Sequence, residues 1–331
     1  MTNREKLLTR ISQLSEDDIT ALLDAVMLMT DMNNAGQVPD CPYCGSSSII
    51  RYGLKHGKQR FLCKSCGKTF LPTTHTIMSM SHYPANVWKE VITDTLRGNA
   101  IDYSVKRLGV SHQAVFDMRH KILLALQDLP ETKNVCLSEV TELDETFVLE
   151  SYKGKKLPTD ASRKARKHGA KAQKRGISNE YVCICTGIQR KGDAYAASIN
   201  RAKPDSEEMK ALFEGHIASG TLVLCDGLRS YNALPSIAEC TVRDCSNCTA
   251  DESHFYNLNT VNGFHSFIKK KYDFYCGVAT KYLNRYNALF AAMYRNADHM
   301  ICRLKEVLLT PGTHNYYHSN KDVRQAGLLL I

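Results

Sequence analysis

The chain has 331 residues, enough for two or three domains, and its hydrophobic content of 43% is ordinary for a globular protein. The formal net charge of +9 favours a polyanionic partner. The polar N-terminus excludes a secretory signal, and the longest early apolar stretch, residues 25–29, is too short to span a bilayer. Thirteen cysteines, an odd number, indicate a reducing cytoplasm and a zinc site rather than a disulfide framework.

Residues 1–37 show helical spacing of leucine and isoleucine and predict an N-terminal helical segment. Residues 38–75 predict a zinc ribbon, because two Cys-x2-Cys pairs place four thiolates around one structural Zn²⁺. The four ligands are Cys41, Cys44, Cys63 and Cys66. The segments between the pairs read as two strands. Basic residues on these strands make DNA contact reasonable, although many such ribbons are only structural.

Residues 83–130 predict a helical domain. A short helix over 101–108, a glycine-containing turn and a helix from the Ser111 cap to Leu126 follow the helix-turn-helix pattern. A plain three-helix bundle is the alternative. The polar residues expected to contact DNA from this domain are His112, Gln113 and Arg119.

A run rich in lysine and arginine extends from residue 153 to residue 175. Such runs are often solvated loops, but this one follows a predicted strand that carries an acid, which favours nucleic-acid contact. The residues assigned to DNA binding are Lys164, Arg166, Lys167, Lys171, Lys174 and Arg175.

Residues 138–300 predict an α/β domain, so the whole chain is expected to be a multi-domain α+β protein, with 301–331 as a C-terminal tail. Three strands, a helix, a strand, a short helix, a strand and a helix are expected in that order, which is typical of a ribonuclease-H-like catalytic domain. Asp144 lies in the first strand and Asp226 closes the fourth. Carboxylates at the ends of buried strands can hold Mg²⁺ or Mn²⁺ between them.

A helix near the end of this domain offers Asn262, His265 and Lys269 on one face, at positions i, i+3 and i+7. An amide oxygen is an acceptable ligand for a hard cation, and a neutral imidazole can bind Mg²⁺ or Mn²⁺ weakly. Lys269 can contact a DNA phosphate. None of these three residues is an acid, so the third carboxylate of a metal site is missing from this helix.

Taken together, these motifs resemble those of insertion-sequence transposases of the zinc-ribbon, DDE-type group. The resemblance covers roughly residues 38–300 and rests on the two Cys-x2-Cys pairs, Glu142-Leu143-Asp144-Glu145, the basic run at 163–176, Cys225-Asp226-Gly227, and residues 261–266 and 277–283. The family usually carries Glu as its third acid, and some members carry Asn or His. Asn262 lies seven residues before Lys269, the family's interval from acid to lysine, so Asn262 is the expected equivalent with His265 beside it.

The resemblance implies metal-dependent cleavage of DNA strands and their transfer into target DNA, with two Mg²⁺ or Mn²⁺ ions held by Asp144 and Asp226. It further implies double-stranded DNA partners (terminal repeats and target), a homodimer or higher synaptic assembly, no membrane partner, and a cytoplasmic, nucleoid-associated location in a bacterium. Two alternatives stay open. The missing third acid favours a DNA-binding regulator with an inactive nuclease-like domain, and a metal-dependent nuclease would cleave DNA without joining it.

A second cysteine cluster lies just before the helix that carries His265. It comprises Cys240, Cys245 and Cys248, with His254 nearby. One Cys-x2-Cys pair with irregular companions is a weak signal for a second zinc site. Two equivalents of zinc per chain would support that site.

Overall fold

The computed structural model describes residues 40–55, 57–154, 156–157, 159, 172, 176–178, 180–201, 203–249 and 251–325. The chain divides into two compact units. The ribbon unit comprises Met1–Glu90 and Lys305–Tyr317, and the sheet unit comprises Val91–Leu304 and His318–Ile331. The helical segment expected at residues 1–37 lies outside the described residues. The expected domain boundaries remain a prediction, although most of the 83–130 helices fall in the same compact unit as the sheet.

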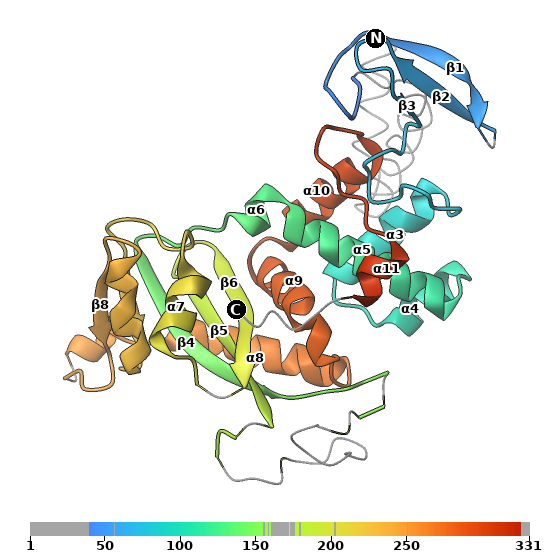
Figure 1. Ribbon diagram of the computed structural model, residues 1–331. Coiled ribbons are helices and arrows are strands. Elements are labelled where there is room, and N and C mark those ends of the chain that lie inside the picture. The colour runs from blue at the N-terminus through green and yellow to red at the C-terminus, as the bar shows by residue number, and fades with distance from the viewer. Residues whose placement is uncertain are drawn as a thin grey trace, which may run out of the picture. The chain divides into compact units, whose positions relative to one another are not determined.

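The ribbon unit contains a three-stranded antiparallel sheet in the order β1 (Ile49–Lys55), β2 (Lys58–Cys63) and β3 (Thr69–Phe70) (Figure 1). The sheet has a small core of its own, made of two of the cysteines and the rings of Phe61 and Phe70, which stack with centroids 5.8 Å apart. Because this core contains so few apolar side chains, we expect a bound metal to contribute to folding of the ribbon.

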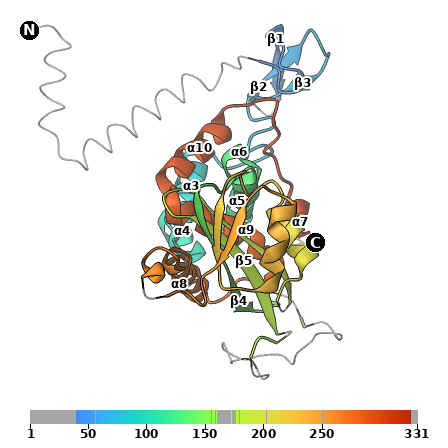
Figure 2. The ribbon, with the colours of Figure 1, turned by 90° about the vertical axis from the view of Figure 1, so that its left-hand side faces the viewer.

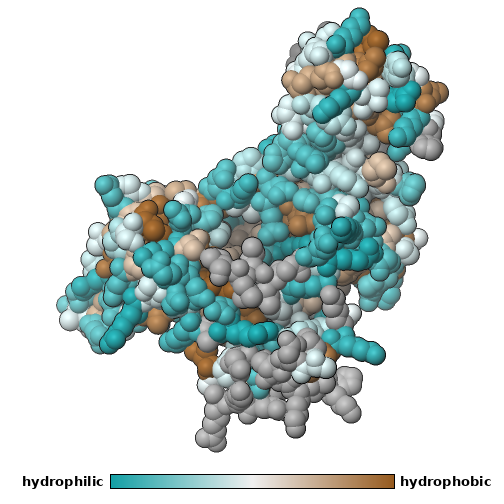
Figure 3. Space-filling view, in the orientation of Figure 1, coloured by the Kyte–Doolittle hydropathy of each residue, from teal (hydrophilic) through white to brown (hydrophobic). Residues whose placement is uncertain are grey.

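The outer strand β1 exposes apolar side chains. Ile50 is 39% exposed and Leu54 is 68% exposed. Figure 3 shows hydrophobic side chains among hydrophilic ones over the ribbon. The guanidinium of Arg60 lies 4.9 Å from the ring centroid of Tyr52, also on β1. These side chains lie outside the ribbon core and expose apolar and basic groups on the ribbon.

Helices follow the ribbon: α3 (Ala85–Leu96), α4 (Ile101–Leu108), α5 (His112–Asp128) and the short α6 (Pro130–Lys133). The hydroxyl of Ser111 accepts a hydrogen bond from the backbone N–H of Ala114, as the predicted cap requires. Gly109 ends α4 with φ of 64°. The buried carboxylate of Asp94 accepts hydrogen bonds from Ser104 and Arg107, both at 2.8 Å, and so joins α3 to α4.

The sheet unit has a five-stranded sheet in the order β6-β5-β4-β7-β8. The strands are β4 (Val140–Leu149), β5 (Tyr181–Gln189), β6 (Ala194–Arg201), β7 (Leu222–Cys225) and β8 (Thr241–Asp244). β4, β5 and β6 form an antiparallel meander, whereas β7 and β8 run parallel to β4. The sequence predicted five strands in this domain, and the structure has five. β4 and β7 are parallel neighbours that begin side by side, and the shorter β7 ends beside the middle of β4.

Helices cover both faces of this sheet. On one face, α7 (Ser206–Phe213) and the 3₁₀ helix η1 (Arg229–Ser236) pack over a core that includes Leu143, Cys185 and Phe213. On the other face lie α8 (Asn259–Phe274) and α9 (Leu283–Arg295). Figure 2 shows α7 and α8 on opposite sides of the strands. Successive side chains of β4 therefore point alternately toward α7 and toward α8.

The remaining elements are η2 (Glu252–His254), η3 (Thr280–Tyr282), α10 (Ala297–Leu309) and α11 (Asn320–Arg324). α10 overlaps the segment 301–331 that was expected to be a C-terminal tail, and α11 lies within it, so that segment contains helical structure. None of the helices in the described part of the chain is both long and apolar enough to cross a membrane.

Candidate active site and metal centres

The two aspartates singled out in the sequence come together where β7 ends beside the middle of β4. Glu142 pairs with Leu224 across these parallel strands, and continuing this register by two residues places Asp226 beside Asp144. Asp144 is half-buried, whereas Asp226, just past the end of β7, is exposed. The backbone N–H of Leu228 donates to the carboxylate of Asp226 at 3.1 Å and holds it in the turn.

A third carboxylate, which the sequence reasoning did not include in the site, belongs to this group. Single oxygens of Asp144, Glu145 and Asp226 all lie within 4.8 Å of one another. Glu145 lies on the α7 side of β4, where the buried hydroxyl of Tyr231 donates a hydrogen bond to its carboxylate. Asp226 lies just past the end of β7 and can be approached from both faces. The Asp-Glu pair in the sequence was the available signal for this third acid.

Burial and the charges of neighbouring acids raise the pKa values of Asp144 and Glu145. Burial raises the pKa of Asp144 to about 6; the backbone N–H of Glu145 and the charge of Lys269 oppose the rise, and the charge of Asp226 adds to it. Burial raises the pKa of Glu145 to about 7. The hydrogen bond from Tyr231 opposes this rise, and the charges of Asp226 and Asp144 add to it. Clustered carboxylates that are costly to ionise together are a suitable environment for a divalent cation.

All three predicted residues of the third segment lie on α8, but they are placed differently. His265 is 5% exposed, and its Nδ1 lies 3.6 Å from Oδ2 of Asp144. Asn262 is exposed, and in the described part of the chain no hydrogen bond joins its side-chain amide to either aspartate. Lys269 is exposed, and its charge acts on both Asp144 and His265. The structure thus brings the imidazole to the first aspartate, whereas the family spacing favoured the amide.

The imidazole of His265 is held from the neighbouring strand. Thr186, which pairs with Asp144 across β4 and β5, has its hydroxyl 2.6 Å from Nε2 of His265. The same hydroxyl donates to the backbone oxygen of Asp144 at 2.8 Å. Burial lowers the pKa of His265 to about 4, and the charge of Lys269 lowers it further, so the ring is neutral at physiological pH.

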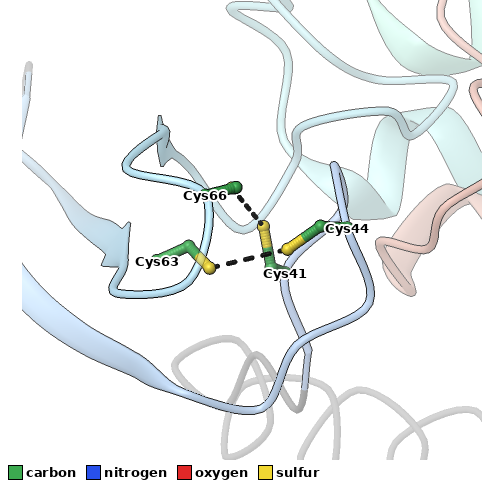
Figure 4. A group of neighbouring side chains, drawn as sticks. All are labelled: Cys41, Cys44, Cys63 and Cys66. Carbon is green, nitrogen blue, oxygen red and sulfur yellow. Dashed lines mark hydrogen bonds between the residues drawn. The ribbon is translucent and has the colours of Figure 1, made fainter.

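The four cysteines of the ribbon converge as the sequence predicted (Figure 4). Sγ of Cys41 lies 3.7 Å from Sγ of Cys66, and Sγ of Cys44 lies 3.7 Å from Sγ of Cys63. A tetrahedral Zn²⁺ with bonds of about 2.3 Å requires sulfur–sulfur edges of about 3.8 Å, so these residues fit the ion. The hydrogen bond from the backbone of Cys66 helps lower the pKa of the Cys63 thiol to about 6, which favours the thiolate that zinc binds.

Glycines form the turn after each cysteine pair. The backbone N–H of Gly45 donates to the oxygen of Cys41 at 2.8 Å, and that of Gly67 donates to the oxygen of Cys63 at 3.0 Å. Their φ angles of 71° and 69° lie in the left-handed region, which glycine adopts without steric cost. The second cysteine cluster does not assemble: in the described residues, Cys240, Cys245, Cys248 and His254 form no metal-sized group.

The predicted DNA-contacting residues fall into three classes. His112 and Gln113 are exposed at the start of α5. Arg119 requires a correction, because its side chain is 1% exposed and donates to the backbone oxygen of Asn99 at 2.7 Å. It lies four residues after buried Val115, on the face of α5 that packs inward. The expected contacts from Lys164, Arg166, Lys167, Lys171, Lys174 and Arg175 lie outside the described residues.

Comparison with known proteins relates this site to transposases. Residues 136–295, just under half of the chain, match the ISXO2-like transposase domain. The matched segment includes the strands that carry Asp144 and Asp226 and the helix that carries His265, and it leaves out the zinc ribbon. The resemblance to insertion-sequence transposases inferred from the motifs is therefore confirmed.

The chain is also similar to an uncharacterized protein in transposable element ISH50 of Halobacterium salinarum. It is 27% identical over 195 residues, which cover 59% of this chain. The match spans 64% of the length of that relative. Among solved structures, a pre-cleavage Mos1 transpososome matches with 13% identity and a TM-score of 0.21, covering 68% of this chain and 78% of that one.

Proposed function

We propose that the chain is a DNA transposase that cleaves strands at the ends of an insertion sequence and transfers them into target DNA in a metal-dependent reaction. The observation that carries this proposal is the convergence of Asp144, Glu145 and Asp226 where β7 ends beside the middle of β4, within the segment that matches the ISXO2-like transposase domain. The sheet order, with an antiparallel meander followed by two parallel strands, supports a ribonuclease-H-like catalytic fold.

The residues at this site fit a catalytic cation. Carboxylate oxygens are the ligands that Mg²⁺ and Mn²⁺ prefer, and three of them lie within 4.8 Å of one another, close enough to bind the same ion. A divalent cation bound there would supply Lewis acidity for attack on a phosphodiester. Asp144 and Asp226 would hold it, and the ammonium of Lys269 would bind a DNA phosphate next to the reacting group.

Duplex DNA is the proposed partner of the other parts of the chain. The start of α5 presents His112 and Gln113 to solvent, in the position that a helix-turn-helix uses to reach base edges. The net charge of +9 and the basic run of residues 153–175 support binding to phosphates. Assembly of two copies would pair the two element ends, and this proposal rests on the family alone.

The decisive experiment is strand transfer in Mg²⁺ on a duplex that carries the inverted repeats flanking the gene. We expect Asp144→Asn and Asp226→Asn each to abolish both cleaved and joined products. Asp273→Asn, which changes an exposed aspartate at the end of α8, is the matched control and should retain activity. Full activity of either active-site variant would contradict the assignment.

A DNA-binding regulator is the second candidate, and the neutral residues Asn262 and His265 on α8 favour it. It predicts that the chain binds duplex DNA but that Mn²⁺ does not bind at Asp144 and Asp226. A nuclease without strand transfer predicts cleaved products and no joined ones. Calorimetric titration with Mn²⁺, followed by product analysis on a gel, separates all three functions.

A further inference from the structure

The hydroxyl of Thr186 lies between the first aspartate and the histidine of α8. Its Oγ1 is 2.8 Å from the backbone oxygen of Asp144 and 2.6 Å from Nε2 of His265. Thr186 is fully buried and His265 is 5% exposed, so water cannot easily replace either contact. Both distances are within the range of well-formed hydrogen bonds.

The single hydroxyl hydrogen of Thr186 decides which group donates in each of these two contacts. A carbonyl oxygen can only accept, so the contact with Asp144 uses the single hydroxyl hydrogen of Thr186. That hydrogen is then unavailable for Nε2 of His265. The short contact to Nε2 must therefore be an N–H of the imidazole donating to Oγ1 of Thr186. A neutral ring that carries its hydrogen on Nε2 has a lone pair on Nδ1.

Nδ1 is the ring nitrogen that approaches the first aspartate. Nδ1 lies 3.6 Å from Oδ2 of Asp144, which is too long for a hydrogen bond between them. Two acceptor atoms therefore face each other with no hydrogen between them, an arrangement that a cation bound to both would stabilise. Mn²⁺ and similar divalent ions accept an imidazole nitrogen together with a carboxylate oxygen.

We propose that Thr186 is a positioning residue that fixes His265 in the Nε2–H tautomer, so that Nδ1 joins Asp144 as a ligand to the catalytic divalent cation. The inference rests on the proposed function, because it assumes that Asp144 and Asp226 hold a cation. It assigns completion of the site to the imidazole of His265 and leaves the exposed amide of Asn262 outside the coordination sphere. Hydrogen bonds that orient a ligating histidine in this way are a recurrent feature of metal sites.

Mn²⁺ binding to the zinc-loaded full chain, measured by calorimetry without DNA, tests the proposal. We expect Thr186→Val, which keeps the shape and removes the hydroxyl, to weaken Mn²⁺ binding by about tenfold to a hundredfold, the usual effect of losing an outer hydrogen bond to a metal ligand. Thr186→Ser should stay close to the wild type. His265→Ala should weaken binding at least as much as Thr186→Val, and Asn262→Ala should leave it unchanged.

Two outcomes would overturn the inference: unchanged Mn²⁺ affinity in Thr186→Val, or a loss in Asn262→Ala that equals the loss in His265→Ala. Asp144→Asn separates this failure from failure of the proposed function. If Asp144→Asn still binds Mn²⁺, the proposed catalytic site is wrong. If Asp144→Asn loses Mn²⁺ while Thr186→Val retains it, only the role of Thr186 is wrong.

The tautomer can be measured directly even if a variant fails to fold. Nitrogen-15 labelling of histidine, with His265 assigned by its disappearance in His265→Gln, distinguishes the two neutral forms by NMR. The wild-type ring should carry its hydrogen on Nε2, and the Nδ1 resonance should shift most when Mg²⁺ is added. A hydrogen found on Nδ1, or an Nδ1 signal that does not respond to Mg²⁺, would contradict the proposal.

Discussion

The carboxylate of Glu142 accepts a hydrogen bond from the backbone N–H of Val261, at 2.9 Å, and so holds the first turn of α8 against β4. Its other oxygen accepts from Nε of Arg190 at 2.7 Å, and this arginine also donates to the backbone oxygens of Phe255 and Asn257. Glu142 is fully buried and lies two residues before Asp144 on the same face of the strand. One side chain therefore sets where α8, with His265, meets the first aspartate.

Replacing Glu142 with glutamine should destabilise the sheet unit and misplace α8. Glutamine can still accept from Val261 but leaves the guanidinium of Arg190 without its charged partner. Loss of one partner from a buried ion pair costs about 3–5 kcal/mol, and partial exposure of Arg190 places this case toward the lower end. Urea unfolding measures the change. Asp298→Asn, which breaks the exposed pair with Arg97, should cost less than about 1 kcal/mol. Equal effects would show that Glu142 does not anchor α8.

The position of α8 against the sheet could not be predicted from the sequence. Alternating apolar residues predicted the strands, and the fixed register of a parallel pair then brings Asp144 and Asp226 together. Helical spacing correctly placed Asn262, His265 and Lys269 on one side of a helix, but it does not determine how that helix rotates against the sheet. The rotation of α8 depends on contacts with Glu142 and Thr186, which are distant from it in sequence. Residue spacing alone therefore could not decide whether Asn262 or His265 approaches the aspartate.

Two other differences between the predicted and the observed site residues have local causes. Glu145 was not included in the site because neighbouring side chains of a strand point to opposite faces. Asp226 lies beyond the end of β7, where both faces are accessible, so it can be close to both acids. Arg119 was assigned to DNA because it is charged, although its spacing from Val115 places it on the inward face of α5. At that position the helical spacing of buried residues predicts the orientation of the side chain better than its charge does.

Removal of zinc should unfold the ribbon and leave the sheet unit folded. The ribbon core is small and includes the cysteines themselves, so metal binding and folding are expected to be coupled. We expect one equivalent of zinc per chain, released by Cys63→Ser and retained by the matched variant Cys245→Ser. Zinc content by a colorimetric chelator and protection of ribbon amides from hydrogen exchange are the measurements. A second equivalent, lost in Cys245→Ser, would instead establish a site at the second cysteine cluster.

Gly227 should resist substitution more than an ordinary turn glycine. Its φ is 82°, and a Cβ built there would lie 2.5 Å from Oδ2 of Asp244. Gly227→Ala therefore combines the left-handed backbone cost, about 1–2 kcal/mol, with a clash beside Asp226. Gly220→Ala is the matched control, because its φ is 79° and a Cβ there meets no atom within 4 Å. Thermal unfolding should show a larger loss for Gly227→Ala, and the added change Asp244→Ala should recover the difference. Equal losses for the two glycines would contradict the clash.

The raised pKa of Glu145 predicts a pH-dependent stability in the absence of Mg²⁺ and Mn²⁺. The folded protein holds this proton up to a pKa of about 7, whereas the ordinary value is 4.5, so the folded state binds more protons between these pH values. Stability from this group is fully present below pH 4.5 and is lost as the pH rises through 7. Urea midpoints of the wild type and Glu145→Gln, compared from pH 4.5 to 8, should diverge across that window, while the exposed variant Glu207→Gln should follow the wild type. Parallel profiles for the wild type and Glu145→Gln would show that Glu145 does not titrate in this window.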